Sequence, residues 1–280
     1  MKFLASVVQL TTTRDIEASY KQATELVRSA AQAGAKLVVL PENVHFMGSE
    51  AEKLELAEPV DGKFFRGLAE LAKSLGIWLL AGTLPETSAT SQRAYNTSTL
   101  FSPEGNLVAK YRKIHLFDVA LGEGATHTES DSVEPGTNAV VAQTELGKIG
   151  MTVCYDLRFP PLFRAMFRAG AEMITVPAAF TVPTGRDHWE VLLRARAIEN
   201  QCYILAAGQF GANTSSRRTF GRSMIIDPWG TVLAVAPDEP GFALAHIDID
   251  KVHSFRQKLP CLQHERLDAY EVTDGKVHER

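Results

Sequence analysis

Residues 33–41 read AGAKLVVLP and residues 169–177 read AGAEMITVP, so the chain carries one short pattern twice. Each copy follows a run of residues with helical spacing, at 17–33 and at 161–169. The glycine stands where a helix C-cap is expected, and the apolar residues after it are few enough for a buried strand. The repeat therefore predicts a helix followed by a buried strand in each half of the chain.

The correspondence continues through a second helix, a second buried strand and a hairpin in each half. The matching segments are 64–75 with 189–201, 77–83 with 203–209, and 98–108 with 223–233. A Pro-X-Gly turn joins the two β-rich runs of both hairpins. Each half is therefore expected to run strand, helix, strand, helix, strand and hairpin.

The apolar character of these strands predicts how the halves combine. Strands that are apolar on both faces need cover on both sides, and two such halves bury most surface by stacking sheet against sheet. This predicts an α/β fold, a four-layer α–β–β–α sandwich with internal pseudo-symmetry. Two separate α/β domains are the alternative, but no Pro/Gly/Ser-rich linker divides the halves, and residues 119–136 read as one long loop. We expect a single domain over residues 1–270 and a polar C-terminal tail over 271–280.

Composition narrows the class of protein. The 280 residues are 45% apolar and 22% charged, which is ordinary for a globular chain, and a net charge of −4 gives no general attraction to nucleic acid or anionic lipid. No apolar run approaches the length of a membrane span, and the N-terminal residues read as a first strand rather than a signal peptide. Three widely spaced cysteines form no disulfide framework. We expect a cytoplasmic protein with neither nucleic-acid nor membrane partners.

Glu42 is a position where the two halves differ. Pro41 is followed by Glu42, whereas its counterpart Pro177 is followed by Ala178. A carboxylate just past a buried strand lies at the carboxyl edge of a sheet, where α/β folds place their ligand crevices. A surface acid or a helix N-cap is the alternative interpretation.

Cys154 ends the apolar segment 147–153 and is followed by prolines where a helix is expected to begin. A turn of this kind is expected to expose the sulfur, to place backbone N–H groups near it and to lower the thiol pKa. An inert core thiol is the alternative, and it is the interpretation we favour for Cys202. Cys261 is given no role.

Lys113 lies at the end of the first predicted hairpin. A cation next to a thiol favours the thiolate and stabilises developing negative charge. A solvated basic residue is the alternative, and we expect that for Lys110 and Arg112. The sequence has no Gly-x-Ser-x-Gly elbow, phosphate-binding loop, Cys-x-x-Cys pair or metal-binding histidine spacing, so we expect no metal and no organic cofactor.

Three segments resemble the signature segments of the nitrilase superfamily of carbon–nitrogen hydrolases. They are LPE at 40–42, KIHLF at 113–117 and VCYDLRFP at 153–160. Their order matches the family, and the resemblance extends from residue 3 to about residue 270. The family has the four-layer sandwich that the internal repeat predicts.

The resemblance implies a mechanism and assigns roles within it. Cys154 is expected to attack an amide carbon, with Glu42 transferring protons and with Lys113 and the backbone N–H of Tyr155 holding the oxyanion. A thioester then forms and is hydrolysed. Glu129 matches a second glutamate that many members place beside the lysine.

The residues after the nucleophile indicate an amidase acting on linear amides rather than a nitrile hydrolase. Nitrile-hydrolysing members tend to have Cys-Trp-Glu, whereas this chain has Cys-Tyr-Asp at 154–156. Segments 184–197 and 259–264 resemble the branch that hydrolyses deaminated glutathione to 2-oxoglutarate and cysteinylglycine. The omega-amidase branch, which acts on 2-oxoglutaramate, usually has Met in place of Leu157. Another small-amide or carbamoyl hydrolase, an acyl-transfer member and a non-catalytic binding protein remain alternatives.

Besides Tyr155, whose backbone N–H is expected to hold the oxyanion, four residues are candidates for binding the small-molecule substrate. Arg158 is expected to bind a substrate carboxylate because it lies one short turn beyond the nucleophile. Arg186 is a second candidate, in a loop expected to rim the pocket, and a structural ion pair is the alternative for both arginines. Phe180 and Thr181 are expected to line the pocket wall. Contacts to a dipeptide leaving group are expected from residues 119–130 and 181–188.

The resemblance also implies a homodimer or larger assembly. Family members usually pair through helices that include the one after the nucleophile. In this chain the apolar residues of that helix are Leu162, Phe163, Met166 and Phe167.

Overall fold

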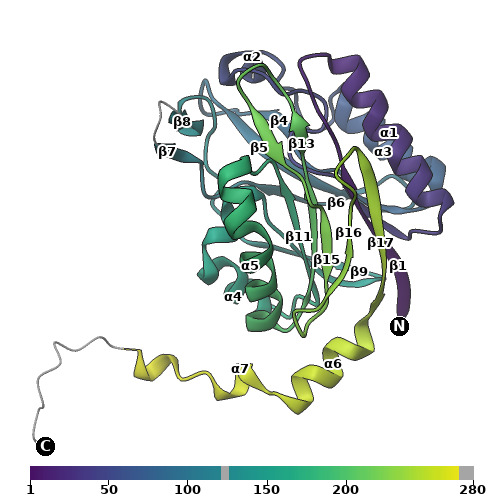
Figure 1. Ribbon diagram of the computed structural model, residues 1–280, viewed down its shortest axis with the longest axis vertical. Coiled ribbons are helices and arrows are strands. Elements are labelled where there is room, and N and C mark those ends of the chain that lie inside the picture. The colour runs from purple at the N-terminus through teal and green to yellow at the C-terminus, as the bar shows by residue number, and fades with distance from the viewer. Residues whose placement is uncertain (121–125, 271–280) are drawn as a thin grey trace, which may run out of the picture.

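The computed structural model describes residues 1–120 and 126–270 (Figure 1). The predicted polar tail, residues 271–280, lies outside the described residues, as do residues 121–125 of the predicted long loop. The helices are α1 (Ile16–Gln32), α2 (Glu50–Glu55), α3 (Lys63–Leu75), α4 (Pro160–Arg168), α5 (Val182–Asn200), α6 (Ile249–Lys258) and α7 (Cys261–His264). The strands are β1 (Lys2–Gln9), β2 (Leu37–Val39), β3 (Trp78–Leu80), β4 (Leu84–Thr87), β5 (Ala94–Phe101), β6 (Leu107–Arg112), β7 (Asp118–Ala120), β8 (Thr126–Thr128), β9 (Val140–Thr144), β10 (Gly147–Met151), β11 (Met173–Ala178), β12 (Tyr203–Gly208), β13 (Phe210–Ala212), β14 (Arg218–Phe220), β15 (Met224–Ile226), β16 (Val232–Val235) and β17 (Gly241–Asp248).

The strands form two large sheets, one built mainly from each half of the chain. The first has the order β17-β1-β2-β3-β5-β4, with β6 paired to β5, and the second has the order β16-β15-β12-β11-β10-β9. Three parallel strands lie inside each sheet, β1 to β3 in the first and β10 to β12 in the second. The late strand β17 pairs antiparallel with β1, so the C-terminal part of the chain completes the sheet of the first half.

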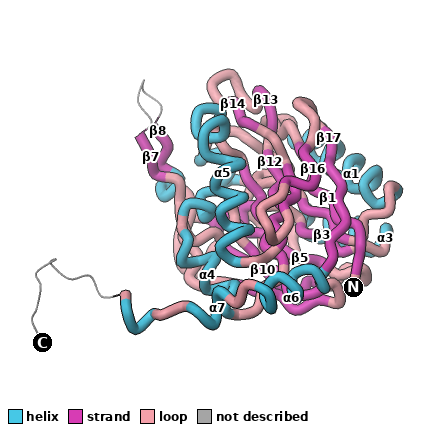
Figure 2. The backbone as a smooth tube through the Cα atoms, turned by 60° about the horizontal axis from the view of Figure 1, so that its bottom comes forward, coloured by secondary structure: helices cyan, strands magenta, loops and turns pink. Residues whose placement is uncertain are grey.

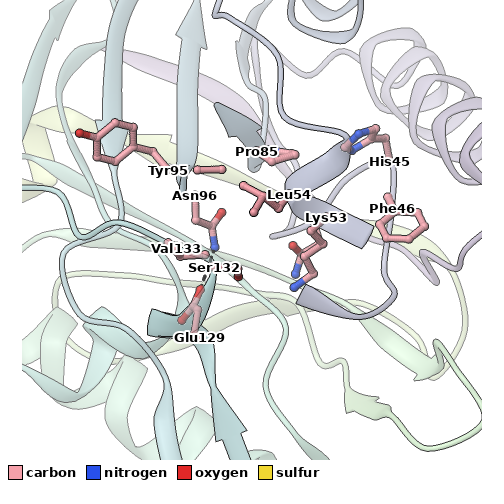
Figure 3. Close-up of a pocket in the computed structure, with 12 residues that line it drawn as sticks. His45, Phe46, Lys53, Leu54, Pro85, Tyr95, Asn96, Glu129, Ser132 and Val133 are labelled. Atoms are coloured by element: carbon pink, nitrogen blue, oxygen red, sulfur yellow. Dashed lines mark hydrogen bonds between the residues drawn. The ribbon is translucent and has the colours of Figure 1, made fainter. Parts of the chain in front are cut away.

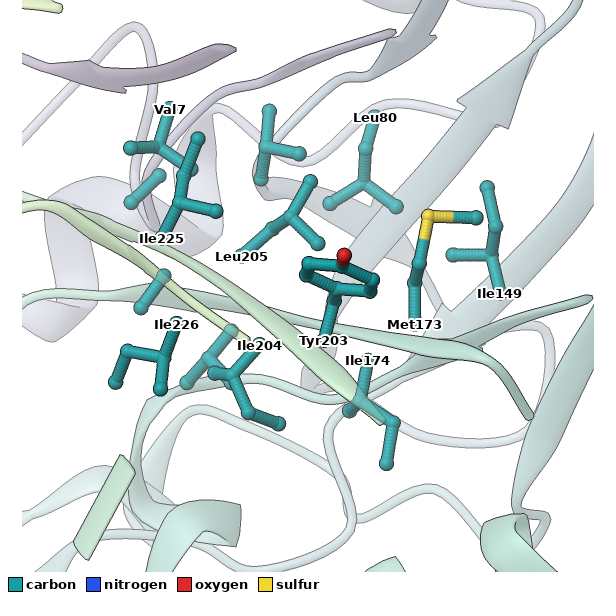
Figure 4. Packing of buried hydrophobic residues seen from close by; sticks show 14 of the residues in the cluster. Val7, Leu80, Ile149, Met173, Ile174, Tyr203, Ile204, Leu205, Ile225 and Ile226 are labelled. Atoms are coloured by element: carbon teal, nitrogen blue, oxygen red, sulfur yellow. The ribbon is translucent and has the colours of Figure 1, made fainter. Parts of the chain in front are cut away.

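The two sheets pack face to face, with helices on the outside. Val7 and Leu80 of the first sheet share one buried cluster with Met173, Tyr203 and Leu205 of the second (Figure 4). A second cluster joins the other face of the first sheet to α1 and α3, while α4 and α5 cover the outer face of the second sheet (Figures 1 and 2). The four-layer α–β–β–α sandwich predicted from the repeat is confirmed.

Glycines end the helices of the repeated pattern as predicted. Gly34, after α1, has a φ of 97°, and Gly170, after α4, has a φ of 88°. These are left-handed values that glycine adopts without a Cβ penalty. At the other end of α1, the Asp15 side chain accepts a hydrogen bond from the Ala18 N–H at 3.0 Å, which satisfies a free donor of the first turn.

Several elements differ from the sequence prediction. The stretch 119–136 was expected to be one long loop, but β7 and β8 pair within it and a 3₁₀ turn (Glu129–Asp131) follows. Strands of three residues are too short to show a recognisable alternation. Helix α5 begins at Val182 rather than at 189, although its first turns contain proline and glycine. A Cβ on Gly185 would lie 2.3 Å from the Phe220 side chain, so this glycine permits close packing of β14 on the helix.

Lys110 and Arg112 are not simply solvated, as the sequence suggested. Lys110 Nζ lies 2.7 Å and Arg112 Nη2 lies 2.8 Å from Oε1 of the buried Glu86 on β4. The two basic residues are two positions apart on β6 and therefore share one face of the sheet. The expectation of solvated side chains was wrong because β4 places a buried carboxylate on that face.

Helix α4 does not present its apolar residues to a partner. Leu162, Phe163, Met166 and Phe167 are all at most 8% exposed and pack into the core. The second sheet covers these side chains, so a pairing through α4 would have to use other residues of the helix, and the expected homodimer stays a prediction. Across residues 1–120 and 126–270, no helix is long and apolar enough to cross a membrane.

Candidate active site

Glu42 lies just past β2, and its side chain is buried. Gln209, which follows β12 in the second sheet, donates from Nε2 to the Glu42 backbone carbonyl at 2.8 Å and to Thr12 Oγ1 at 2.7 Å. Asn43, the next residue, has a φ of 59°. The turn that presents Glu42 is therefore held in place by the opposite sheet.

Cys154 begins a 3₁₀ turn (Cys154–Arg158) between β10 and α4. Its φ is 50°, a left-handed value that is uncommon for a residue other than glycine. The fully buried Asp156 holds this turn by accepting hydrogen bonds from Tyr111 Oη at 2.7 Å and from the His115 N–H at 3.1 Å. Because Tyr111 and His115 flank Lys113 in the chain, Asp156 joins the turn of Cys154 to the segment that carries the lysine.

Lys113 follows β6 and is 2% exposed. Its Nζ donates to Glu42 Oε1 at 3.1 Å and to the two oxygens of Glu129 at 2.9 and 2.7 Å. The Phe117 N–H also donates to Glu129 Oε2 at 2.7 Å, which fixes that carboxylate. One buried ammonium therefore pairs with two carboxylates from separate segments of the chain.

Asn96, on β5, was not singled out by the sequence. Its Nδ2 donates to Glu42 Oε1 at 2.9 Å and to Glu129 Oε1 at 3.3 Å, and Figure 3 shows Asn96 directed toward Glu129. The amide thus links the same two carboxylates that bind Lys113. The signal that was available is an asparagine inside a strand-forming run, where this residue type is normally depleted.

Burial dominates the ionisation of the cluster. It raises the pKa of the Cys154 thiol well above its ordinary value, and the negative charge of Glu42, which is hydrogen-bonded to the thiol, raises it further. The positive charge of Lys113 opposes this effect but does not outweigh it. The sequence-based expectation of an exposed sulfur with a lowered thiol pKa was therefore wrong, because Cys154 is only 8% exposed and lies beside a carboxylate.

Lys113 and Glu129 stabilise each other's charged forms. Burial alone would lower the pKa of Lys113, but the charges of Glu129 and Glu42 hold that pKa well above its usual value. Burial alone would raise the pKa of Glu129, and the charge and hydrogen bonds of Lys113 keep it below its usual value. The site therefore holds a fixed ammonium beside a protonated thiol near neutral pH.

A cavity of about 1040 Å³ opens over this cluster. Its wall includes Glu42, Lys113, Glu129 and Cys154, together with residues of the turns after β2, β6, β10 and β11 and of the hairpin β13–β14. The carboxyl ends of parallel strands meet here, which is where α/β folds bind ligands. The volume is at the upper end of the range of about 300–1,000 Å³ for small-molecule pockets.

Most of the predicted substrate-binding residues line this cavity, namely Tyr155, Arg158, Phe180 and Thr181. The Arg158 guanidinium lies 5.6 Å from the ring centre of Phe180 and within 3.4 Å of His188 Nδ1. Within the described part of the chain, no carboxylate forms an ion pair with Arg158. Its charge is thus available to the cavity.

Arg186 does not line the cavity. The sequence placed it in a rim loop, but α5 has already begun at Val182, and the helical turn leaves Arg186 exposed on the outer side. The expected rim loop is therefore a helix here, and a substrate-binding role for Arg186 stays an untested prediction.

A second, smaller cavity of about 30 Å³ lies next to Asn96 and Glu129 (Figure 3). His45 is part of its wall, and burial lowers the pKa of His45 to about 4. The ring is therefore neutral near pH 7 and is poorly suited to donate protons there. In the segments that the structure describes, no group of three or more His, Cys, Asp or Glu side chains is placed to hold a metal ion.

The cluster at the larger cavity has the parts that acyl transfer from an amide requires. A thiol is hydrogen-bonded to a carboxylate that can take its proton, and a fixed ammonium lies beside both groups. The Tyr155 backbone N–H follows the nucleophile in a tight turn, where it can donate to an oxyanion. Such a set supports attack on a carbonyl carbon, collapse to a thioester and hydrolysis.

Comparisons with known proteins identify a family and relatives that span most of the chain. A family model described as carbon-nitrogen hydrolase matches residues 4–257. The deaminated glutathione amidase of Synechocystis sp. is 44% identical over 265 residues, 94% of this chain and 97% of that protein. The human protein of the same name is 45% identical over 272 residues, 95% of this chain and 83% of that protein.

Two solved structures share the fold. The C. elegans NitFhit protein has a TM-score of 0.90 and 35% identity, covering 96% of this chain and 66% of that chain. Saccharomyces cerevisiae Nit3, described as a member of branch 10 of the nitrilase superfamily, has a TM-score of 0.84 and 32% identity. That match covers 96% of this chain and 97% of the yeast chain.

Proposed function

The chain belongs to the carbon–nitrogen hydrolase family, and from that premise we propose that it is an amidase that hydrolyses deaminated glutathione to 2-oxoglutarate and cysteinylglycine. The observation that carries the proposal is the buried contact of the Cys154 thiol with Glu42, beside Lys113, at the floor of a large cavity. The similar proteins of Synechocystis sp. and human are named deaminated glutathione amidase, which supports this choice of substrate. The unpaired charge of Arg158 suits a carboxylate on the acyl side of that substrate.

In the proposed reaction, Glu42 takes the thiol proton while the sulfur of Cys154 bonds to the amide carbon. Lys113 Nζ and the Tyr155 N–H hold the negative oxygen of the tetrahedral intermediate. The C–N bond then breaks, and the amine leaves with the proton from Glu42. This leaves the acyl group on the sulfur as a thioester.

Water completes the cycle in the proposed second half. Glu42 takes a proton from the water as it attacks the thioester, and the sulfur leaves and regains a proton. Glu129 is assigned a supporting role, because both of its oxygens accept hydrogen bonds from Lys113 Nζ and so fix the ammonium beside Glu42. The scheme requires no metal or organic cofactor, so turnover should survive dialysis against a chelator and be lost on alkylation of the thiol.

The proposal includes a homodimer in the cytoplasm. A reactive free thiol must be kept reduced, which fits a reducing compartment, and all three cysteines are free. With the apolar face of α4 buried, we assign the dimer contact to the outer face of α5, where Val191 and Ile198 are 66% and 50% exposed.

The test is kcat/KM for deaminated glutathione and for 2-oxoglutaramate under the same conditions, with Cys154→Ala as the inactive control. We expect turnover of both compounds, with a higher kcat/KM for deaminated glutathione, because the large cavity provides contacts for the dipeptide. Cys154→Ala should retain the circular dichroism spectrum and lose turnover. A ratio near one, or one favouring 2-oxoglutaramate, would place the protein with the omega-amidases, and wild-type-like turnover of Cys154→Ala would refute the mechanism.

A further inference from the structure

The wall of the large cavity carries more positive than negative charge. Three of its six arginine and lysine side chains are paired with carboxylates: Lys113 with Glu129, Lys53 with Glu50, and Arg14 with Glu52. Among the described residues, Arg158, Arg217 and Arg218 line the cavity without an ion pair, and Asp187 is the only lining carboxylate without one. The cavity therefore suits a ligand with more than one negative charge.

The unpaired cations come from two different walls. Arg158 lies in the turn that begins with Cys154, whereas Arg217 and Arg218 belong to the hairpin β13–β14. This hairpin was not predicted from the sequence. One ligand that reached both elements would carry one anionic group for Arg158 and another for the arginines of the hairpin.

The hairpin is anchored to the body of the protein. Asn213 Nδ2 donates to the Thr12 carbonyl at 3.0 Å, and Asn213 Oδ1 accepts from Thr219 Oγ1 at 2.8 Å. The Phe210 N–H donates to the Leu10 carbonyl at 2.7 Å. A hairpin held in this way places its arginines at a defined position on the cavity wall.

Arg217 is placed to bind an anion. Its Nε is buried and has no hydrogen-bond partner among the described residues, which is costly for part of a charged group. The pKa of His127, another wall residue, is lowered by burial and then by the positive charge of Arg217. The charge of Arg217 therefore acts on other groups that line the cavity.

We propose that Arg217, assisted by Arg218, binds the terminal carboxylate of the leaving amine and so selects amides whose leaving group is a peptide with a free C-terminal carboxylate rather than ammonia. The inference rests on the proposed function, in which Arg158 binds the carboxylate on the acyl side. Cysteinylglycine ends in a glycine carboxylate, whereas 2-oxoglutaramate releases only ammonia and leaves Arg217 without a ligand. The hairpin thus adds a third region to the two from which leaving-group contacts were expected, residues 119–130, of which 121–125 lie outside the described residues, and residues 181–188.

The first test compares Arg217→Ala with the wild type on both compounds. The ratio of kcat/KM for deaminated glutathione to kcat/KM for 2-oxoglutaramate should fall roughly 10- to 100-fold, the effect of losing a charge-assisted hydrogen bond of about 1.5–3 kcal/mol. Arg217→Lys, which keeps the charge, should recover part of the ratio. Arg28→Ala is the matched control, because it removes the same charge from an exposed position on α1 away from the cavity and should leave the ratio unchanged.

The second test replaces the terminal carboxylate of deaminated glutathione with a carboxamide. The wild type should hydrolyse the carboxamide roughly 10- to 100-fold less efficiently, whereas Arg217→Ala should barely distinguish the two compounds. An Arg217→Ala enzyme that prefers the carboxylate as strongly as the wild type would overturn the inference and leave the proposed function standing. A wild-type enzyme that hydrolyses neither deaminated glutathione nor 2-oxoglutaramate would refute the proposed function and the inference with it.

Discussion

Cys154 combines a strained backbone with a buried side chain. Its φ of 50° lies in a region that costs a non-glycine residue about 1–3 kcal/mol. Asp156 offsets that cost through its hydrogen bonds to the segments on either side of Lys113. The same geometry places the sulfur beside Glu42, so the thiol stays protonated until a base removes its proton.

Glu42→Gln separates the two effects of this carboxylate on Cys154. The negative charge of Glu42 is one of the causes that raise the thiol pKa, so the pKa of Cys154 should fall when that charge is removed. Turnover should drop roughly 10²–10⁴-fold, because glutamine cannot accept the proton. The measurement is the pH dependence of the rate at which a thiol alkylator modifies Cys154 in a Cys261→Ser background. Cys202 should not interfere, because it is fully buried in the core. An unchanged or higher Cys154 pKa in Glu42→Gln would contradict this account.

At the scale of secondary structure, the edge formed by β4, β5 and β6 supports the catalytic cluster. Asn96 lies on β5 and Lys113 directly follows β6, so the pairing of these strands places both residues. Glu86 on β4 holds the edge together through Lys110 and Arg112 of β6. Burial alone would raise the pKa of Glu86, but hydrogen bonds from Arg112, Lys110 and other neighbours lower it from 4.5 to about 2.

Glu86→Gln should therefore destabilise the fold in a pH-dependent way. A carboxylate whose pKa is lower in the folded state stabilises the fold above its unfolded pKa, and the stabilisation is lost as pH falls from 4.5 to about 2. The lowered pKa corresponds to about 3 kcal/mol of unfolding free energy at pH 7. Urea unfolding of the wild type and of Glu86→Gln measures the stability lost through the substitution. That difference in unfolding free energy should be smaller at pH 3 than at pH 7. Glu25→Gln, at an exposed site on α1, is the control and should change stability by less than about 0.5 kcal/mol.

At the scale of the whole molecule, exposed apolar side chains remain on one side of the second sheet. Val191 and Ile198 lie on the outer face of α5, and Leu267 and Tyr270, in the C-terminal segment, are 56% and 62% exposed. Figures 1 and 2 show that segment running past α4 and away from the body of the protein. An apolar surface of this kind is typical of a protein interface.

We expect light scattering at micromolar concentration to give twice the 30.7 kDa chain mass. Ile198→Asp should shift the protein toward the monomer, because it places a charge in the proposed interface. Leu107→Asp, at an exposed apolar position on β6 in the other sheet, is the control and should remain dimeric. A wild-type protein of 30.7 kDa, or an unaltered dimer in Ile198→Asp, would exclude this interface.

The sequence by itself determined the architecture and identified Glu42, Lys113, Glu129 and Cys154 as residues of the cluster. The helix–glycine–strand repeat is a local pattern, so periodicity and turn chemistry were sufficient to predict two matching halves and the stacking of their sheets. Glu42 and Cys154 stood out because the repeat does not account for them. Their meeting with Lys113 is confirmed, while their catalytic roles remain a proposal.

Only the tertiary structure decided the surroundings of those residues. Gln209 reaches Glu42 from the opposite sheet, Asn96 bridges two carboxylates, and Arg217 is brought to the cavity by a hairpin too short to recognise. The raised thiol pKa and the inward packing of α4 were also missed. Each depends on desolvation or charge from groups distant in the chain, and local sequence patterns carry no information about which distant groups fold against a given residue.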